Sequence, residues 1–215
     1  MVRGASGERR SARSGPSAAA AEGENAIAGA ANSPKRSGGK WSIAPLGAEH
    51  THGLAACHVA CWREAYQGLV PQHVLDAFDV DQRAAAWERI RIKYPGHVVV
   101  AVVDDAVVGF AASGPAREQN PPTPLELTAM YVRAAYYGTG LADDLMRTVL
   151  SDEGDTSLWV FEENPRAQAF YKRYGFELDG ERRVEAFTPA LQVRMVRRAP
   201  RDEDRRPTPG ITRRR

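Results

Sequence analysis

The chain has 215 residues, 43% of them hydrophobic, which is enough to bury one sizeable core and favours a single domain. Its formal net charge of +2 is unevenly spread: residues 1–40 carry seven basic against three acidic side chains and residues 197–215 eight against three, which leaves about −7 on residues 41–196. No stretch approaches the roughly 18 apolar residues of a membrane helix. The composition thus excludes a membrane-spanning class and predicts a soluble protein, which we expect in the cytoplasm.

The two ends of the chain differ in composition from the middle. Residues 1–40 consist mainly of Ala, Gly, Ser and Arg without any aromatic residue, and residues 199–215 are rich in Arg. Burial cannot repay the ordering entropy of such segments, so both are predicted to lack fixed structure and to flank a domain at 41–198. Glu22, Glu24 and Asn25 interrupt the Ala-rich stretch and disfavour a secretory signal, whereas the Arg and Ser content leaves a transit peptide open.

Hydrophobic periodicity within the domain predicts helices and strands in mixed order. A short strand at 41–47 is followed by two helices, of which the second begins at Asp79 or Asp81 and ends before Pro95. Two Val-rich runs around "DDA" predict a hairpin. The predicted helices are 52–66, 79–94, 141–150 and 164–175, and the predicted strands are 41–47, the hairpin 97–114, 125–132, 157–161 and 191–196, with one or two strands at the end. This order indicates a mixed α/β domain.

Two cysteines one helical turn apart, Cys57 and Cys61, raise the question of a metal site with His50, His52 and His58. Zinc sites usually pair a short Cys spacing with a second ligand pair downstream, and none follows here. We therefore expect buried, reduced thiols on a helix face and no metal.

The segment "YYGTGLADDL" places Gly138 and Gly140 between a strand and an amphipathic helix. Unpaired amides at a helix start, together with the helix dipole, bind anions, and glycine lets a phosphate approach closely. A P-loop is excluded because no Lys follows either glycine. A dinucleotide fingerprint fits poorly but stays open through Glu162, as does a plain helix-entry turn.

Several motifs in order resemble the GNAT superfamily of N-acetyltransferases. "LELTAMYVRAAYYGTGLADDLM" and "WVFEENPRAQAFYKRYGFE" are similar to its acetyl-coenzyme A (acetyl-CoA) signatures, and "CWREAYQGLVP" and "VVGFAA" to its first helix and central strand. The resemblance covers about Ile43 to Val196. It implies a single domain with a central, mostly antiparallel, twisted sheet flanked by helices.

The same resemblance implies how acetyl-CoA is bound. The family motif [QR]xxGx[GA] departs here at its first position, where a tyrosine stands, although backbone amides do most of the pyrophosphate binding. The implied pyrophosphate residues are Tyr137, Gly138, Thr139, Gly140, Leu141 and Ala142. The pantetheine arm would pair with the backbone of Met130 and Val132, while Asn164 both caps its helix and contacts that arm.

Catalysis by this family assigns two side chains in the present sequence. Glu126, four residues before Met130, is expected on the same strand face, where it would accept the amine proton directly or through water; an ordinary strand residue is the alternative. Tyr171 matches the tyrosine that protonates the departing thiolate, although it could simply pack. The Met130 N–H would polarise the thioester carbonyl.

The acceptor side is the least defined by sequence. Trp62, Tyr66 and Glu64 are candidates to contact a primary amine of a small molecule or peptide, and the acidic middle of the chain favours a cationic amine. The alternative function is a non-catalytic CoA-sensing adaptor whose basic tails bind nucleic acid or acidic partners. The tails lack interleaved aromatics, so nucleic-acid binding is disfavoured. A homodimer stays open.

Overall fold

The computed structural model describes residues 41–151, 154–184 and 190–199. The predictions for the basic tails, including the adaptor function that depends on them, concern segments that lie almost entirely outside these residues. The bounds 41–198 of the domain therefore stay a prediction.

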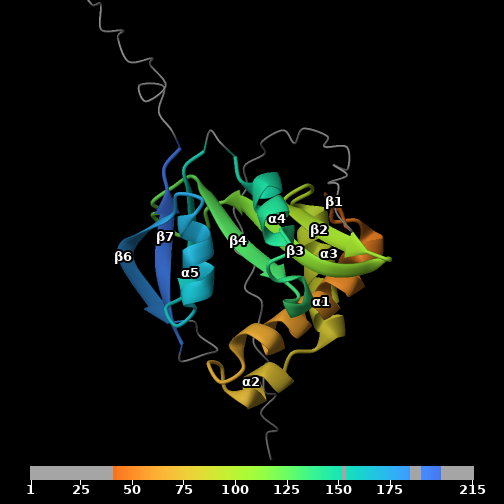
Figure 1. Cartoon of the computed structure of the whole chain (residues 1–215). Helices are drawn as coiled ribbons and strands as arrows, with labels where there is room; N and C mark the ends of the chain where they lie inside the picture. The colour runs from red at the N-terminus through yellow and green to blue at the C-terminus, as the bar shows by residue number, and fades with distance from the viewer. Residues whose placement is uncertain (1–40, 152–153, 185–189, 200–215) are drawn as a thin grey trace, which may run out of the picture.

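A seven-stranded sheet in the order β1-β2-β3-β4-β5-β7-β6 forms the centre of the domain (Figure 1). All neighbouring strands are antiparallel except β4 and β5. The strands are β1 (Ser42–Pro45), β2 (Val98–Val103), β3 (Ala106–Pro115), β4 (Leu125–Val132), β5 (Thr156–Phe161), β6 (Glu177–Val184) and β7 (Leu191–Arg197). The expected mixed, mostly antiparallel sheet is confirmed. Of the one or two strands predicted at the end of the chain, two are present, β6 and β7.

The predicted hairpin turns at Asp104 and Asp105, which both have positive φ, 47° and 63°. Two consecutive left-handed residues make the tight turn whose twist matches that of the flanking strands. The hairpin joins β2 and β3, both largely buried, in the middle of one half of the sheet.

The four predicted helices are present, and their ends lie within one turn of the expected bounds. They are α1 (Thr51–Tyr66), α3 (Val80–Lys93), α4 (Leu141–Val149) and α5 (Pro165–Lys172), and the short elements η1 (Ala48–His50), α2 (Gln72–Asp76) and η2 (Ala134–Tyr136) were not expected. The Asp79 carboxylate accepts a hydrogen bond from the Gln82 amide at 2.7 Å, which confirms it as the cap of α3.

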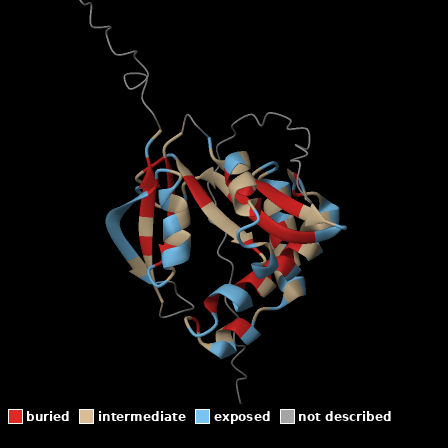
Figure 2. Ribbon diagram, in the orientation of Figure 1, coloured by how far each residue is buried: buried red, intermediate tan, exposed pale blue. Residues whose placement is uncertain are grey.

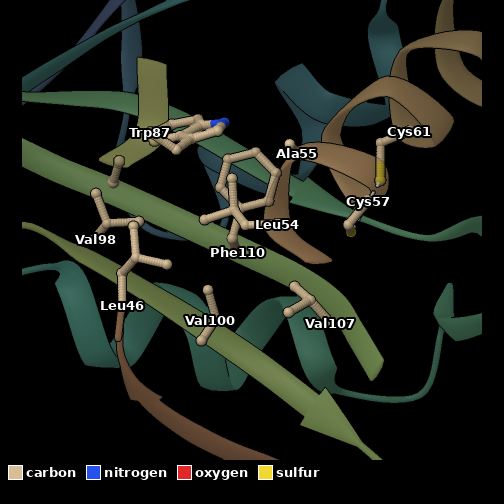
Figure 3. Close-up of a cluster of buried hydrophobic side chains, with 11 residues drawn as sticks. Leu46, Leu54, Ala55, Cys57, Cys61, Trp87, Val98, Val100, Val107 and Phe110 are labelled. Carbon is tan, nitrogen blue, oxygen red and sulfur yellow. Dashed lines mark hydrogen bonds between the residues drawn. The ribbon is translucent and has the colours of Figure 1, made fainter. Parts of the chain in front are cut away.

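Helices cover the two faces of the sheet unequally (Figures 1 and 2). α1 and α3 pack on one face of β2 and β3 through a cluster that includes Leu54, Trp87 and Phe110 (Figure 3). α4 packs on the other face through Leu141 and Leu145. α5 covers β5 and β7 on the α4 side, around a third cluster that contains the fully buried Phe176.

A bulge in β4 changes which side chains face the site. Ala112 is opposite Ala129 but Ser113 is opposite Leu127, so Thr128 is an extra residue. Leu127 and Met130 consequently pack into the same cluster on the α4–α5 face. Since adjacent strand residues alternate, Glu126 lies on the opposite face, toward α1 and α3. The expectation that Glu126 and Met130 share a face was wrong, because strict alternation does not hold across a bulge.

Candidate functional site

The site is a cavity of about 1860 Å³ lined by residues of β4, β5, α1, α3, α5 and the turn before α4. It exists because β4 and β5 pair only at Leu125–Thr156 and Glu126–Ser157 in the described part of the chain, beyond which their ladder ends. The two halves of the sheet thus separate, and the cavity occupies the region between them. We call it the central cavity.

The backbone of Met130 and Val132 faces this separation. The Arg133 N–H donates to the Val108 carbonyl at 2.9 Å, so Arg133 and Val108 form a hydrogen-bonded pair of the β3–β4 ladder. In an antiparallel ladder such pairs alternate, so Met130 and Val132 direct their N–H and C=O groups away from β3. Both residues line the central cavity. Their backbone groups can therefore pair with an extended ligand, as the resemblance implied.

The glycine turn lies at one end of the central cavity. Gly138 and Gly140 have φ of 74° and 93°, which favour glycine, and a Cβ on either would meet no atom within 4 Å. The open space above the backbone is a cradle that a side chain would fill. α4 begins at Leu141, so the first amides of the helix are without intrahelical partners and can bind an anion.

Arg166 is a residue of this end that the sequence reasoning missed. Its guanidinium lies 3.4 Å from the centroid of the Tyr137 ring. The position that usually carries Gln or Arg in the motif thus holds an aromatic platform, on which a cation from α5 stacks. Arg166 has no carboxylate partner among the described residues, and it lines the cavity beside Gly138. In the sequence, the only feature that points to Arg166 is its position in the first turn of a helix, directly after Asn164 and Pro165.

Asn164 and Tyr171 come from α5. The Asn164 side chain accepts a hydrogen bond from the Ala167 amide at 3.1 Å, and Pro165 follows, which confirms the helix cap. Tyr171 packs against Phe170 and Phe176 while lining the cavity. Burial, and to a smaller extent Tyr66, raise the pKa of Tyr171, so its phenol keeps its proton. Tyr171 is therefore a hydrogen-bond donor inside the cavity.

Glu126 is held by Arg117, which the sequence reasoning did not consider. Its Oε2 accepts from the Arg117 backbone N–H at 3.1 Å, and its Oε1 lies 3.3 Å from the guanidinium. The carboxylate is buried but lines the central cavity from the α1–α3 side. Its role as a base stays a prediction; if it accepts a proton, it does so from within an ion pair.

The acceptor candidates Trp62 and Tyr66 lie on α1 and are largely buried. They form an aromatic cluster with Phe161 and Tyr131, and both also line the central cavity. Tyr66 hydrogen-bonds with Tyr131. Burial raises the pKa of both phenols, that of Tyr131 to about 12. These residues therefore belong both to the core and to the cavity wall.

The Glu64 carboxylate is occupied by hydrogen bonds within the chain. Its carboxylate accepts from Arg133 at 2.9 Å and from the Ala134 amide at 2.8 Å. These contacts tie α1 to the segment that leads from β4 into the glycine turn. Glu64 therefore positions the turn.

The cysteine cluster is structural. Cys57 and Cys61 are buried, with their sulfurs 3.9 Å apart, and Figure 3 shows them at the edge of the α1–α3 core. Within the described residues there is no group of three or more His, Cys, Asp or Glu side chains that could hold a metal ion. Also within them, none of the helices is long and apolar enough to cross a membrane.

Comparison with known proteins agrees with this geometry. Residues 95–178 match the model of an acetyltransferase (GNAT) domain. The uncharacterized N-acetyltransferase Rv2669 of Mycobacterium tuberculosis is 29% identical over 119 residues, which cover 53% of this chain and 74% of that protein.

Two solved structures share the fold. PH1933 from Pyrococcus horikoshii aligns with a TM-score of 0.55 and 21% identity over 74% of this chain and 99% of its own. The PaiA N-acetyltransferase of Thermoplasma acidophilum, solved in complex with coenzyme A, aligns with a TM-score of 0.51 and 14% identity over 72% of this chain and 97% of its own. The matched segment, the relatives and the shared fold together support a GNAT-type acetyltransferase domain in this chain.

Proposed function

We propose that the protein transfers the acetyl group of acetyl-CoA to a primary amine of a small molecule or peptide. The observation that carries the proposal is the central cavity, which connects an anion-binding turn to the Tyr171 phenol and then to the aromatic wall of α1. A cosubstrate with a phosphate end and a reactive thioester end fits this sequence of surfaces.

The phosphate end is assigned to the glycine turn and Arg166. The open backbone at Gly138 and Gly140, the free amides at the start of α4 and the stacked guanidinium all favour an anion there. The PaiA N-acetyltransferase, which shares this fold, binds coenzyme A, and this supports the same ligand here. Met130 and Val132 would hold its extended arm by backbone pairing.

Acetyl-CoA, when bound, supplies an activated acetyl group whose C–S bond breaks as the acceptor nitrogen forms its bond to the carbonyl carbon. The Met130 N–H stabilises the charge that develops on the carbonyl oxygen. Tyr171 donates its phenolic proton to the leaving sulfur, and the attacking nitrogen loses its proton to Glu126 directly or through water. The proton count is closed when Glu126 releases its proton to solvent and solvent returns a proton to Tyr171.

Substitution of Tyr171 by phenylalanine tests this assignment. Loss of the proton donor should lower kcat by about 10²-fold or more, the usual contribution of a general acid, with acetyl-CoA affinity changed little. Tyr174→Phe is the matched control, because Tyr174 lies on the same segment but does not line the cavity, and its hydroxyl donates to Asp143.

Three measurements separate the outcomes: acetyl-CoA affinity by calorimetry, thiol release with a panel of amines, and acetylated product by mass spectrometry. Equal turnover by wild type and Tyr171→Phe would remove Tyr171 from catalysis. Absence of acetyl-CoA binding in the wild-type chain would overturn the proposed function itself, and binding without transfer to any amine would favour the CoA-sensing alternative.

A further inference from the structure

The acidic side chains that line the central cavity all have arginine partners in the chain. The ion pairs are Glu64 with Arg133, Glu118 with Arg194, Glu126 with Arg117 and Asp143 with Arg173. Arg183 binds Gln192 and stacks on Trp159. The cavity therefore presents no unpaired carboxylate from the described residues to a second cationic group of the acceptor.

Arg83 is the exception on the side away from the glycine turn. It lies on α3, half-buried, and contacts the Phe78 ring with its guanidinium 4.9 Å from the ring centroid. Among the described residues it has no carboxylate partner, although it lines the cavity. A guanidinium stays charged even when burial lowers its pKa, so the cavity wall carries one uncompensated positive charge here.

Two unpaired hydrogen-bond donors lie in the same wall. The His58 Nε2 accepts from Trp62 at 2.9 Å, so the neutral ring carries its proton on Nδ1, and this Nδ1–H has no partner among the described residues. The Trp87 Nε1–H is likewise buried without a partner among them, and its ring centroid is 5.6 Å from that of His58. Trp87 follows Arg83 by one turn of α3.

These observations together describe a region where donors of the described residues have no acceptor among them. Buried donors are normally paired, and a lone guanidinium inside a wall of aromatic rings favours an anion of single charge. Burial and the Arg83 charge also lower the pKa of His58 to about 3, so His58 adds no second positive charge near neutral pH. One guanidinium therefore matches one carboxylate better than a doubly charged phosphate.

We propose that the acceptor amine also carries a carboxylate, which Arg83 binds in the part of the cavity between α1 and α3, with His58 and Trp87 as the donor-rich wall beside it. This inference rests on the proposed acetyl transfer, which makes the bound amine the acceptor, but the carboxylate site itself can be tested without turnover. It runs against the expectation of a cationic acceptor drawn from the net charge of residues 41–196, because local pairing in the cavity outweighs the remote surface charge.

The first experiment measures binding of small aromatic probes to the full chain saturated with coenzyme A, by ligand-detected NMR. Phenylacetate should bind about tenfold or more tightly than its neutral isostere phenylacetamide, since a charge-assisted pair with Arg83 is lost in the amide. Arg83→Gln should abolish the difference. Arg89→Gln, an exposed arginine of the same helix outside the cavity, should keep it.

Several results would overturn the inference. Equal binding of the two probes, or an unchanged preference in Arg83→Gln, would leave the wall to packing or ordered water. Tighter binding of benzylphosphonate than of phenylacetate would assign the site to phosphate instead. A second assay compares kcat/KM for phenylalanine and phenylalanine amide as acceptors, and we expect the preference for the free acid to fall about tenfold in Arg83→Gln. Failure of acetyl-CoA to bind would contradict the proposed function, while the same probe experiment on the full chain without coenzyme A would still decide the carboxylate site.

Discussion

Gly140 offers the sharpest test of where the phosphates bind, through its substitution by aspartate. The residue has φ 93° and precedes α4, and a Cβ there meets no protein atom within 4 Å. A non-glycine residue in this conformation costs about 1–2 kcal/mol of folding stability, which is a Tm decrease of about 2–8 °C for a domain of this size. The variant should therefore fold.

Its affinity for acetyl-CoA should fall much further. A carboxylate about 5 Å from one phosphate charge costs about 3 kcal/mol at an effective dielectric constant near 20, which raises Kd about 100-fold. Gly140→Asn separates the charge from the backbone strain, because asparagine has nearly the same shape, is neutral and tolerates left-handed backbone. We expect its loss of affinity to be the smaller of the two.

Gly180 provides the matched control. It has φ 94°, equally open surroundings, and lies on β6 outside the central cavity. Gly180→Asp should lower Tm to a similar extent but leave the Kd of acetyl-CoA, measured by calorimetry, near the wild-type value. Equal Kd values for Gly140→Asp and Gly180→Asp would refute the assignment of the glycine turn to the phosphates.

Three individual contacts give further predictions. Arg166→Ala should raise the Kd of acetyl-CoA about tenfold, by removal of a charge-assisted contact, and a Kd equal to that of wild type in a titration would exclude Arg166 from the site. Leu145→Ala, at a fully buried position of α4, should lower the urea-unfolding free energy by about 2–5 kcal/mol, and a loss below about 1 kcal/mol would show that the α4 contact is loosely packed. The pKa of His58 is about 3 in the folded chain, mainly through burial, and about 6.5 when unfolded, so the unfolded state binds the extra proton and stability falls as pH drops from about 6.5 toward 3. The part of this slope due to His58, up to about 1.4 kcal/mol per pH unit, should disappear in His58→Leu when unfolding is measured at pH 6 and pH 5, and identical slopes would show that His58 is charged in the fold.

The bulge in β4 shows how far a strand pattern could be used to predict the site. The composition of residues 125–132 is sufficient to identify a strand, and alternation then places Glu126 beside Met130. The extra residue Thr128 arises from the pairing of β4 with β3, and Thr128 itself binds the Ala112 carbonyl across that ladder at 3.2 Å. Because the partner strand decides the register, the face of Glu126 could not be predicted from β4 alone.

By itself, the sequence determined the features that depend on near neighbours along the chain: the helical periods of α1 and α3, the caps at Asp79 and Asn164, and the glycines whose positive φ shapes the turn before α4. These follow from backbone conformation and from side chains a few residues apart. Only the tertiary structure decided which charges remain unpaired. Arg166 meets Tyr137 through the packing of α5. Arg83 is left without a carboxylate because every acid lining the cavity is paired with an arginine from another part of the chain. Pairing in three dimensions, which no single segment contains, therefore sets the electrostatic character of the site.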